Sequence, residues 1–189
     1  MTMAADEFTA LFRTCIPHLR AYARSLVHNA DGADDLVQDT LLRAWASRVQ
    51  FAEGTNFRAW MFTILRNRFL DQRRRDRLGS VSIDEVIDAS IVSRPAQDSV
   101  LYFDDMARAF WKLSPPHREI LMLVGAMGLG YDEAAKIIGC AVGTVRSRLS
   151  RARTELQSTL EKGRAHPGRR NVATSERGAA EFLRVLSAA

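Results

Sequence analysis

The stretch that decides the fold is YDEAAKIIGCAVGTVRSRLSRARTEL, residues 131–156. Its first half has helical spacing over 132–138 and stops at Gly139, and a second helix is predicted to begin near Val142. The apolar residues of that second helix fall on one side of it: Val145, Leu149, Ala152 and Leu156. A small residue in the first helix, a glycine in the turn and an apolar residue in the second helix let two helices cross closely. The stretch therefore predicts a helix-turn-helix.

The opposite side of the second helix is polar and rich in arginine, which suits bidentate contacts with phosphates and guanine edges. A helix with such a face fits the major groove of DNA. The residues predicted to contact DNA on this side and its flanks are Thr144, Arg146, Ser147, Arg148, Ser150, Arg151 and Arg153. The alternative is a solvated face on an ordinary helical pair. Ala141 is a local weakness, because Ser or Thr is usual near a helix N-cap.

The other periodic segments also predict helices, and none shows the sustained alternation of a strand. They cover about 6–26, 33–45, 57–75, 99–113 and 115–127. Pro17 should kink or restart the first of these helices because it lacks an N–H. Ser114 and Pro115 are typical of the start of the last one. The predicted fold class is all-α, with two small helical domains joined by a flexible linker.

Composition excludes several broad classes of protein. The 189 residues are 47% hydrophobic and 26% charged, close to the globular average, which argues against wholesale disorder. The cysteines, Cys15 and Cys140, form neither a disulfide framework nor a CxxC pair. The uncharged run from Ile120 to Tyr131 is too short to cross a bilayer, and the acidic N-terminus is unlike a signal peptide. We expect a soluble, cytoplasmic protein without a membrane partner.

The charge is distributed in blocks. The net charge is +5, and 24 of the 27 basic residues are arginine, a bias that a GC-rich genome could also produce. Six arginines lie within 66–77 and four within 143–156, whereas 78–104 contains one arginine and five acids. Two basic blocks separated by an acidic tether indicate two nucleic-acid-facing modules.

The segment 53–77 combines aromatic and basic residues. Phe57, Trp60 and Phe62 begin a helix that ends in three consecutive arginines. Aromatic rings beside cations are typical of sites that stack unpaired bases. Aromatics at helical spacing are more often core, however, and Trp60 is expected to be buried. The loop 49–56 is then the better place to hold an extruded base.

A cluster of acids and amides lies within 34–39. On the outer face of a helix it would repel DNA and would suit a basic protein partner. A favourable interaction with the helix dipole is the alternative for Asp34 and Asp35, but it does not explain Asp39.

These motifs together resemble a known family. The segments DLVQD (35–39) and FRAWMF (57–62) are similar to region 2 of bacterial sigma factors, and LSPPHRE (113–119), YDEAA (131–135) and GCAVGTVRSR (139–148) are similar to region 4. The lack of a middle domain resembles the extracytoplasmic-function (ECF) sigma factors. The wording GTN (54–56), LVGA (123–126) and GCAVGT (139–144) resembles the EcfG group of general stress sigma factors.

The resemblance implies partners and roles. Core RNA polymerase would be bound through its β′ clamp helices and β flap, promoter DNA at its −10 and −35 elements, and an anti-sigma factor of the NepR type would regulate the protein. The residues that match the β′ contact are Asp35, Gln38, Asp39 and Arg43. Those that match the −10 contact are Asn56, Phe57, Arg58, Arg66, Arg68, Arg73, Arg74 and Arg75. Arg146, Ser147, Ser150 and Arg151 match the −35 readers, and Arg148 and Arg153 suit phosphates.

The implied organisation has four parts. They are region 2 at 1–77, an acidic linker at 78–98, region 4 at 99–160, and a basic tail of unassigned role at 161–189, with a possible short helix over 175–186. Two rival functions stay open: a sigma mimic that sequesters an anti-sigma factor without binding DNA, and an ordinary helix-turn-helix regulator. An enzyme is not expected, because there is no glycine-rich phosphate loop and the four histidines are scattered. No cofactor and no metal are predicted.

Overall fold

The computed structural model describes residues 5–27, 29–79 and 98–163, and every regular element within these ranges is helical. The predicted all-α class is therefore confirmed. The elements are α1 (Ala5–Leu26), α2 (Ala30–Ala46), the 3-10 turn η1 (Arg48–Gln50), α3 (Phe57–Gly79), α4 (Asp98–Lys112), α5 (Pro115–Ile120), the π-helical turn η2 (Leu121–Ala126), α6 (Tyr131–Ile138) and α7 (Val142–Gly163). Most of the predicted linker, 80–97, and the possible short helix at 175–186 lie outside the described residues.

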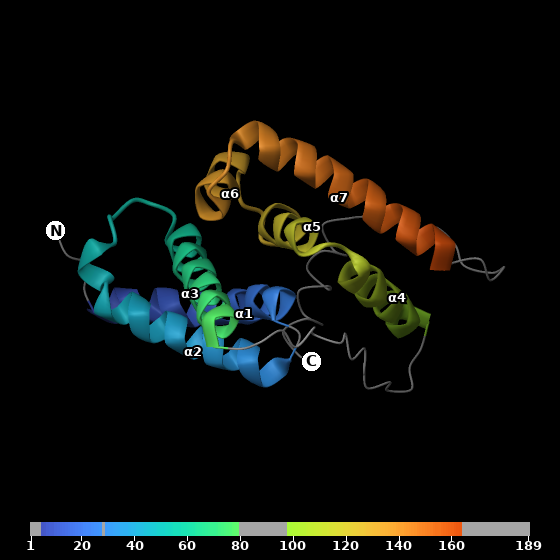
Figure 1. The fold of residues 1–189 in the computed structure, drawn as a ribbon. Helices are drawn as coiled ribbons and strands as arrows, with labels where there is room; N and C mark the ends of the chain where they lie inside the picture. The colour runs from blue at the N-terminus through green and yellow to red at the C-terminus, as the bar shows by residue number, and fades with distance from the viewer. Residues whose placement is uncertain (1–4, 28, 80–97, 164–189) are drawn as a thin grey trace.

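The helices α1, α2 and α3 form an N-terminal unit, residues 5–79 (Figure 1). Each contributes one apolar stripe to a shared core, in which Leu19, Leu36 and Phe62 are fully buried. Burial of such side chains is worth about 1.5–3 kcal/mol each, enough to outweigh weak local preferences. The helix α1 continues through Pro17 without a restart, which was one of the two outcomes predicted there. Pro17 lies on the exposed side, and Cys15 beside it is anchored in the core, so packing keeps both halves in one helix.

The loop between α2 and α3 is ordered by a turn and a cap. Gly54 has φ +80, a left-handed conformation that glycine adopts without steric cost. Asn56 caps α3, because its side-chain Oδ1 accepts a hydrogen bond from the Ala59 N–H at 3.2 Å. An aromatic cluster fixes the loop against α1, and its members are Phe8, Phe12, Phe51, Phe57 and Trp60.

The helices α4 to α7 form a C-terminal unit, residues 98–163, that contains the predicted helix-turn-helix. Gly139 ends α6 with φ +74, and its N–H donates to the Ala135 carbonyl at 2.8 Å. Ala141 opens α7 with its backbone alone: its carbonyl accepts from the N–H groups of Thr144 and Val145 at 2.9 and 3.2 Å. The predicted core side of α7 is inside, with Val145, Leu149 and Ala152 buried and Leu156 partly buried.

The segment predicted as one helix over 115–127 has two forms. It begins as the α-helix α5 after Ser114, whose carbonyl accepts from His117 and Arg118 while its side chain makes no capping bond. From Leu121 it widens into η2, and the Met127 N–H donates five residues back to Met122 at 2.8 Å. Gly128, with φ +69, then ends the element. The apolar residues of both forms face the core, so the pattern of the sequence does not distinguish them.

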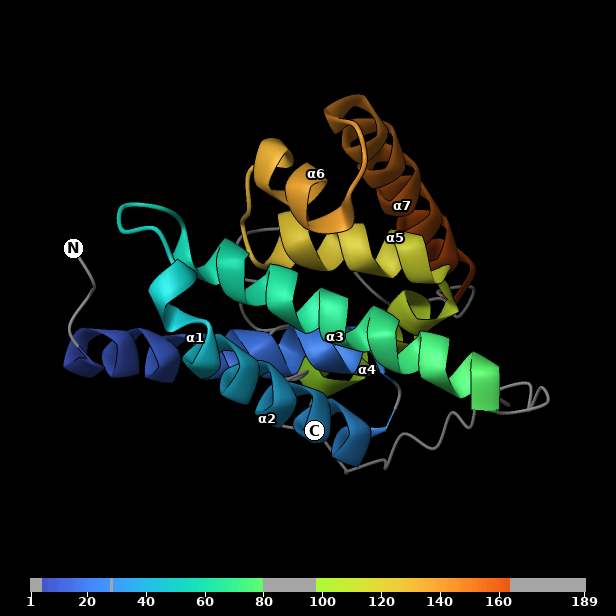
Figure 2. The same cartoon turned by 60° about the vertical axis from the view of Figure 1, so that its left-hand side comes forward.

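The two units pack against each other. The helix α1 contacts α5 and η2, and α3 contacts α6. Figure 1 and Figure 2 show α5 and α6 lying over α1 and α3, with α7 on the outer side of the C-terminal unit. The fold therefore brings residues of the two predicted DNA-binding modules together, and it leaves one side of α7 facing outward.

Candidate nucleic-acid interfaces

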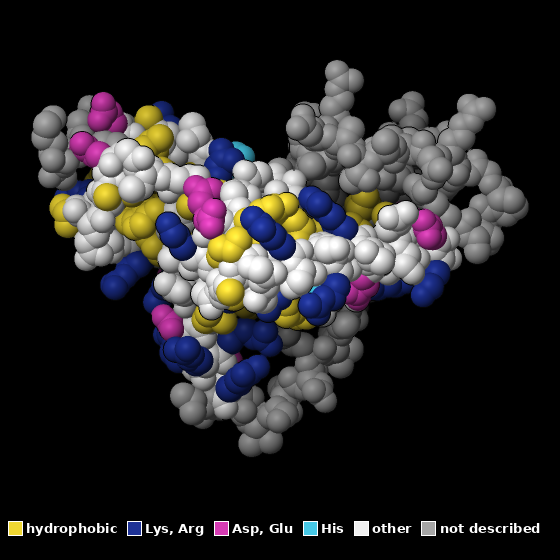
Figure 3. Space-filling view, turned by 90° about the horizontal axis from the view of Figure 1, so that it is seen from above, with side chains coloured by type: hydrophobic (Ala, Val, Ile, Leu, Met, Phe, Trp, Pro, Cys, Tyr) yellow, Lys and Arg dark blue, Asp and Glu magenta, His cyan; other side chains and the backbone are white. Residues whose placement is uncertain are grey.

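The outward side of α7 carries the residues predicted to read duplex DNA. The exposed members are Arg146, Ser147, Ser150, Arg151 and Arg153, whereas Thr144 and Arg148 are half-buried on the flanks. Figure 3 looks onto this side from above and shows more Lys and Arg than Asp and Glu side chains there. The polar side of α7 faces outward because the apolar residues on the opposite side of this helix are buried in the core.

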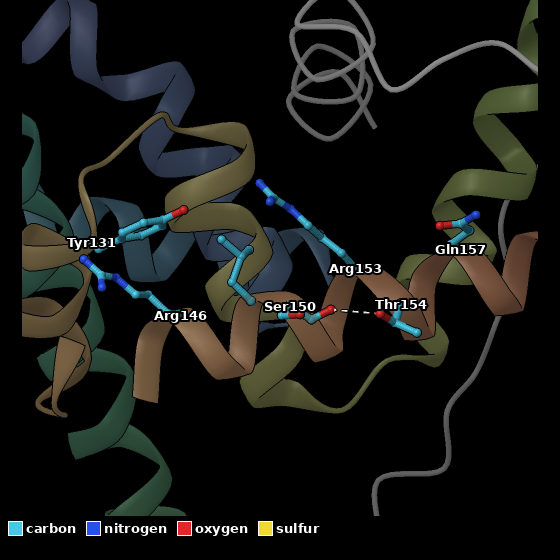
Figure 4. A pocket seen from close by; sticks show the side chains of 7 residues that line it. Tyr131, Arg146, Ser150, Arg153, Thr154 and Gln157 are labelled. Atoms are coloured by element: carbon cyan, nitrogen blue, oxygen red, sulfur yellow. Dashed lines mark hydrogen bonds between the residues drawn. The ribbon is translucent and has the colours of Figure 1, made fainter. Parts of the chain in front are cut away.

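A shallow groove of about 400 Å³ runs between α6 and α7 on this side. Figure 4 shows its lining, in which the Arg146 side chain reaches toward the ring of Tyr131. The guanidinium carbon lies 5.6 Å from the ring centroid, within the range of a cation–π contact. Sequence reasoning did not single out Tyr131 for this role. The available signal was an aromatic residue at the first position of the first helix of a helix-turn-helix.

The residues predicted for the −10 element lie in a different setting, because three of them contact the C-terminal unit. Arg66 Nε donates to Glu119 Oε1 at 2.7 Å, and the two side chains are only 17% and 11% exposed. Asn56 Nδ2 donates to Glu133 Oε1 at 2.6 Å. Arg58 makes a longer hydrogen bond of 3.5 Å from its guanidinium Nη1 to the Met127 carbonyl.

The carboxylate of Glu119 has a second partner from the N-terminal unit. The hydroxyl of Tyr22, which is fully buried, donates to the same Oε1 atom at 2.9 Å. Burial and, next, the neighbouring Glu119 charge raise the pKa of Tyr22 well above its ordinary value. Tyr22 therefore keeps its proton and remains a hydrogen-bond donor to Glu119 at any physiological pH.

The remaining predicted −10 residues are divided between core and surface. Phe57 is 8% exposed within the aromatic cluster, so the structure places its ring in the core, out of reach of a stacked base. The Phe57 ring is held there because four neighbouring aromatic rings pack around it. Three of the predicted residues, Arg73, Arg74 and Arg75, are exposed near the end of α3. Arg68 is half-buried, and its NH2 group donates to Asp39 Oδ2 at 2.6 Å.

The outer face of α2 carries the residues predicted for the polymerase contact. Asp35, Gln38 and Arg43 are exposed, whereas Asp39 is half-buried beside Arg68. Large apolar side chains also reach the surface at this end of the unit: Leu42 is 71% exposed, Val49 69% and Trp45 42%. Trp45 is only partly covered because it lies at the end of α2, at the edge of the aromatic cluster. Leu42 and Val49 were not predicted as functional residues.

The comparisons with known proteins agree with this arrangement. Residues 11–78 match the family model for Sigma-70 region 2, and residues 104–156 match that for Sigma-70 region 4. The ECF RNA polymerase sigma factor EcfG of Rhodopseudomonas palustris is 48% identical over 145 residues, which span 77% of this chain and 80% of that protein. The chain belongs to the ECF sigma factors.

Two solved structures extend the likeness to this sigma factor's fold. The sigma factor RpoE of Bartonella quintana, solved with the anti-sigma factor NepR, is 44% identical and superposes with a TM-score of 0.71, covering 85% of this chain and 100% of that one. The PhyRSL–NepR complex of Sphingomonas sp. Fr1 gives a TM-score of 0.60 over 90% of this chain and 98% of that one. At 19% identity the second likeness concerns the fold alone.

Other kinds of site find little support in the described part of this sigma factor. Over residues 5–27, 29–79 and 98–163, no group of three His, Cys, Asp or Glu residues is placed to hold a metal ion. Within the same ranges, no helix combines the length and apolar character needed to cross a bilayer. Burial raises the pKa of the Cys15 thiol to about 11, which leaves it a poor nucleophile at neutral pH.

Proposed function

We propose that this protein directs core RNA polymerase to promoters, with region 2 at 1–77 and region 4 at 99–160 acting on separate promoter elements. The N-terminal unit would bind the −10 element as a single strand, and the C-terminal unit would read the −35 element as duplex. The observation that carries this proposal is the arginine-bearing side of α7, held outward by a helix-turn-helix in a chain of the ECF sigma family.

The −35 contact would be made by α7 in the major groove. Arginine can donate two parallel hydrogen bonds to a guanine edge, and hydroxyls can bond to several bases. Arg146, Ser147, Ser150 and Arg151 are exposed and suited to base edges. Arg148, Arg153 and Thr144, on the flanks, suit the phosphates, which position the helix without selecting sequence.

The −10 contact would form around the loop 49–56 and the start of α3. Extruding a base from a duplex costs a few kcal/mol, so a pocket and nearby cations must compensate. Asn56 and Arg58 lie at the end of that loop, and Arg66, Arg68 and Arg73 to Arg75 continue along α3 as partners for phosphates. Phe57 would support the loop from within the core, where it is 8% exposed.

Core RNA polymerase would be bound on α2. Asp35, Gln38, Asp39 and Arg43 supply the polar contacts to the β′ clamp helices, and the C-terminal unit would meet the β flap. The exposed apolar side chains beside the polar ones, Leu42 in particular, add surface that a partner can bury, and exposed apolar clusters of this kind are typical of protein interfaces.

Regulation by an anti-sigma factor of the NepR type follows from two similarities. RpoE of Bartonella quintana, at 44% identity, was solved with NepR, and the relative EcfG gives its name to the group that we associate with the general stress response. We accordingly propose a cytoplasmic, non-enzymatic transcription initiation factor of the stress response.

Run-off transcription with purified core polymerase from the protein's own organism tests this proposal. The expected result is specific RNA from at least one promoter, lost when Arg146 and Arg151 are both replaced by alanine. A matched control replaces Arg13 of α1 and Arg108 of α4, which are exposed and have no predicted role in binding DNA, and should keep full activity. A protein that gives no RNA but binds a NepR-type anti-sigma factor would be a sigma mimic. One that gives no RNA and does not bind core polymerase but binds duplex DNA specifically would be an ordinary regulator.

A further inference from the structure

Two acidic side chains of the C-terminal unit accept hydrogen bonds from residues of the N-terminal unit to which we assign −10 DNA binding. We propose that the side of the C-terminal unit formed by α5, η2 and α6 is a docking surface for these residues of the same chain. Docking holds the free protein in a closed form that cannot bind the −10 strand. This inference rests on the −10 role given to Asn56, Arg58 and Arg66 under the proposed function.

The first contact of the closed form is centred on Glu119. One of its oxygens, Oε1, accepts from Arg66 Nε at 2.7 Å and from the Tyr22 hydroxyl at 2.9 Å. A carboxylate that accepts from an arginine imitates a phosphate oxygen, since both are anionic acceptors of the same donor. Arg66 is 17% exposed and Glu119 11%, so the pair is shielded and a DNA phosphate cannot reach the guanidinium while Glu119 is there.

The second contact is prepared by the cap of α6. Glu133 Oε2 accepts from the Gly130 N–H at 3.0 Å, which fixes the carboxylate. The other oxygen, Oε1, then accepts from Asn56 Nδ2 at 2.6 Å. The side-chain amide of Asn56 is in turn held by its own cap of α3. Both partners are thus preorganised, and little side-chain entropy is lost when they meet.

The third contact uses backbone. The Met127 carbonyl follows η2 and accepts from the Arg58 guanidinium at 3.5 Å. Together the three contacts pair every member of the set Asn56, Arg58 and Arg66 with an acceptor of the C-terminal unit. The partners lie 77, 69 and 53 residues apart in the sequence, so all three form only when the units dock.

A cleft of about 330 Å³, open to the surface, lies between the units, and its lining includes Cys15, Arg58, Met127 and Leu129. Interfaces between domains of one chain commonly permit relative motion. Removing the polar contacts should therefore shift the population toward an open form.

The test uses the full-length protein without polymerase. The probe is a fluorescent single-stranded oligonucleotide carrying the −10 element of a promoter that the wild-type protein transcribes with core polymerase. In the variant Glu119→Gln/Glu133→Gln the docking charges are removed at nearly constant volume. The matched control, Asp132→Asn/Glu161→Gln, removes the same two charges from exposed positions of α6 and α7.

At equal salt, we expect the Glu119→Gln/Glu133→Gln protein to bind the oligonucleotide roughly tenfold more tightly than wild type, because its binding-competent fraction rises. Its radius of gyration from solution scattering should also increase. The control should change affinity by less than about twofold, the scale expected of nonspecific charge effects away from the site. Binding of −35 duplex should be the same in all three proteins.

Tyr22→Phe provides a second, milder opening of the closed form. It removes one hydrogen bond to Glu119 and leaves the ring packed against Phe62, whose centroid is 5.2 Å away. Its affinity should lie between those of wild type and the double variant. Equal affinities and equal radii across all these proteins would overturn the docking proposal. Because the probe comes from a transcribed promoter, that failure would leave the proposed function standing, whereas absence of transcription would remove both.

Discussion

The molecule has two arginine-rich surfaces that look alike in the sequence and differ in the fold. On α7 the arginines predicted to read bases are exposed, and a groove opens beside them. On the N-terminal unit, Arg66 and Asn56 are bonded to carboxylates of the other unit. Charge in the sequence thus indicates a candidate nucleic-acid surface, but it does not say whether the arginines of that surface are free to bind. Availability depends on which acids the fold brings opposite.

The largest expected effect is a loss of stability when a buried residue on the core side of α7 is replaced. Leu149, on the core side of α7, is 2% exposed, and Leu149→Ala should lower the free energy of unfolding of the C-terminal unit by about 2–5 kcal/mol, because it removes buried methyl groups and leaves a cavity. Chemical denaturation followed by circular dichroism measures the change. The neighbouring exposed Ser150→Ala should stay within about 0.5 kcal/mol, and equal losses in both variants would contradict the assignment of the core side.

The next effect concerns base reading on the open surface. Arg146→Ala should reduce discrimination between the −35 sequence and a substituted one by about 1–3 kcal/mol, because a bidentate contact is lost. Competition binding with polymerase holoenzyme measures this ratio at fixed salt. If affinity for cognate and scrambled −35 sequences fell equally, Arg146 would be a phosphate contact and not a reader.

A smaller effect is expected for the ring beside that arginine. Tyr131→Ala should weaken −35 discrimination by about 0.5–1 kcal/mol, the usual size of an exposed cation–π contact. Tyr131→Phe keeps the ring and should retain the discrimination. In the Arg146→Ala background the Tyr131→Ala substitution should have no further effect; an additive loss in that double variant would separate the two residues.

The smallest effect is a pH dependence on the covered side. Burial and, next, the Arg58 charge lower the pKa of His18, while a hydrogen bond to the Thr14 carbonyl opposes them. The unfolded chain then binds a proton more readily than the folded one as pH falls through about 6.5. The free energy of unfolding should therefore decrease between pH 7 and pH 5, and less so in His18→Gln. Denaturant midpoints measured across that pH range test this prediction. If the midpoint changed with pH equally in the wild-type and His18→Gln proteins, His18 would not contribute.

Much of the fold could be predicted from the sequence, because each helix is specified by local spacing. The helix-turn-helix is the clearest case: Gly139, Val145 and Leu149 have their roles within about ten residues of one another. Two features of the fold depend on contacts between separate segments and could not be predicted from local spacing. Packing on both sides of Pro17 holds α1 together, and rings from three segments surround Phe57 and draw it into the core.

The candidate site was predictable on α7 and much less so on the N-terminal unit. The exposure of Arg146 follows from the apolar stripe on its own helix. The covering of Arg66 depends on Glu119, which is 53 residues away and belongs to another unit. No periodicity within either segment carries that information. The apolar surface at Leu42 was missed for a related reason, since an apolar residue in a helix is assigned to the core by default.

Glu133 illustrates how tightly these features constrain the chain. One oxygen of this carboxylate stabilises the first turn of α6, and the other meets Asn56 across the gap between the units. An alanine there would fray the helix-turn-helix at the same time as it released the N-terminal unit. Only a side chain that still accepts a hydrogen bond from the Gly130 N–H could release the N-terminal unit without fraying the helix-turn-helix. A single glutamate thus couples the stability of the helix-turn-helix to the contact that holds the N-terminal unit.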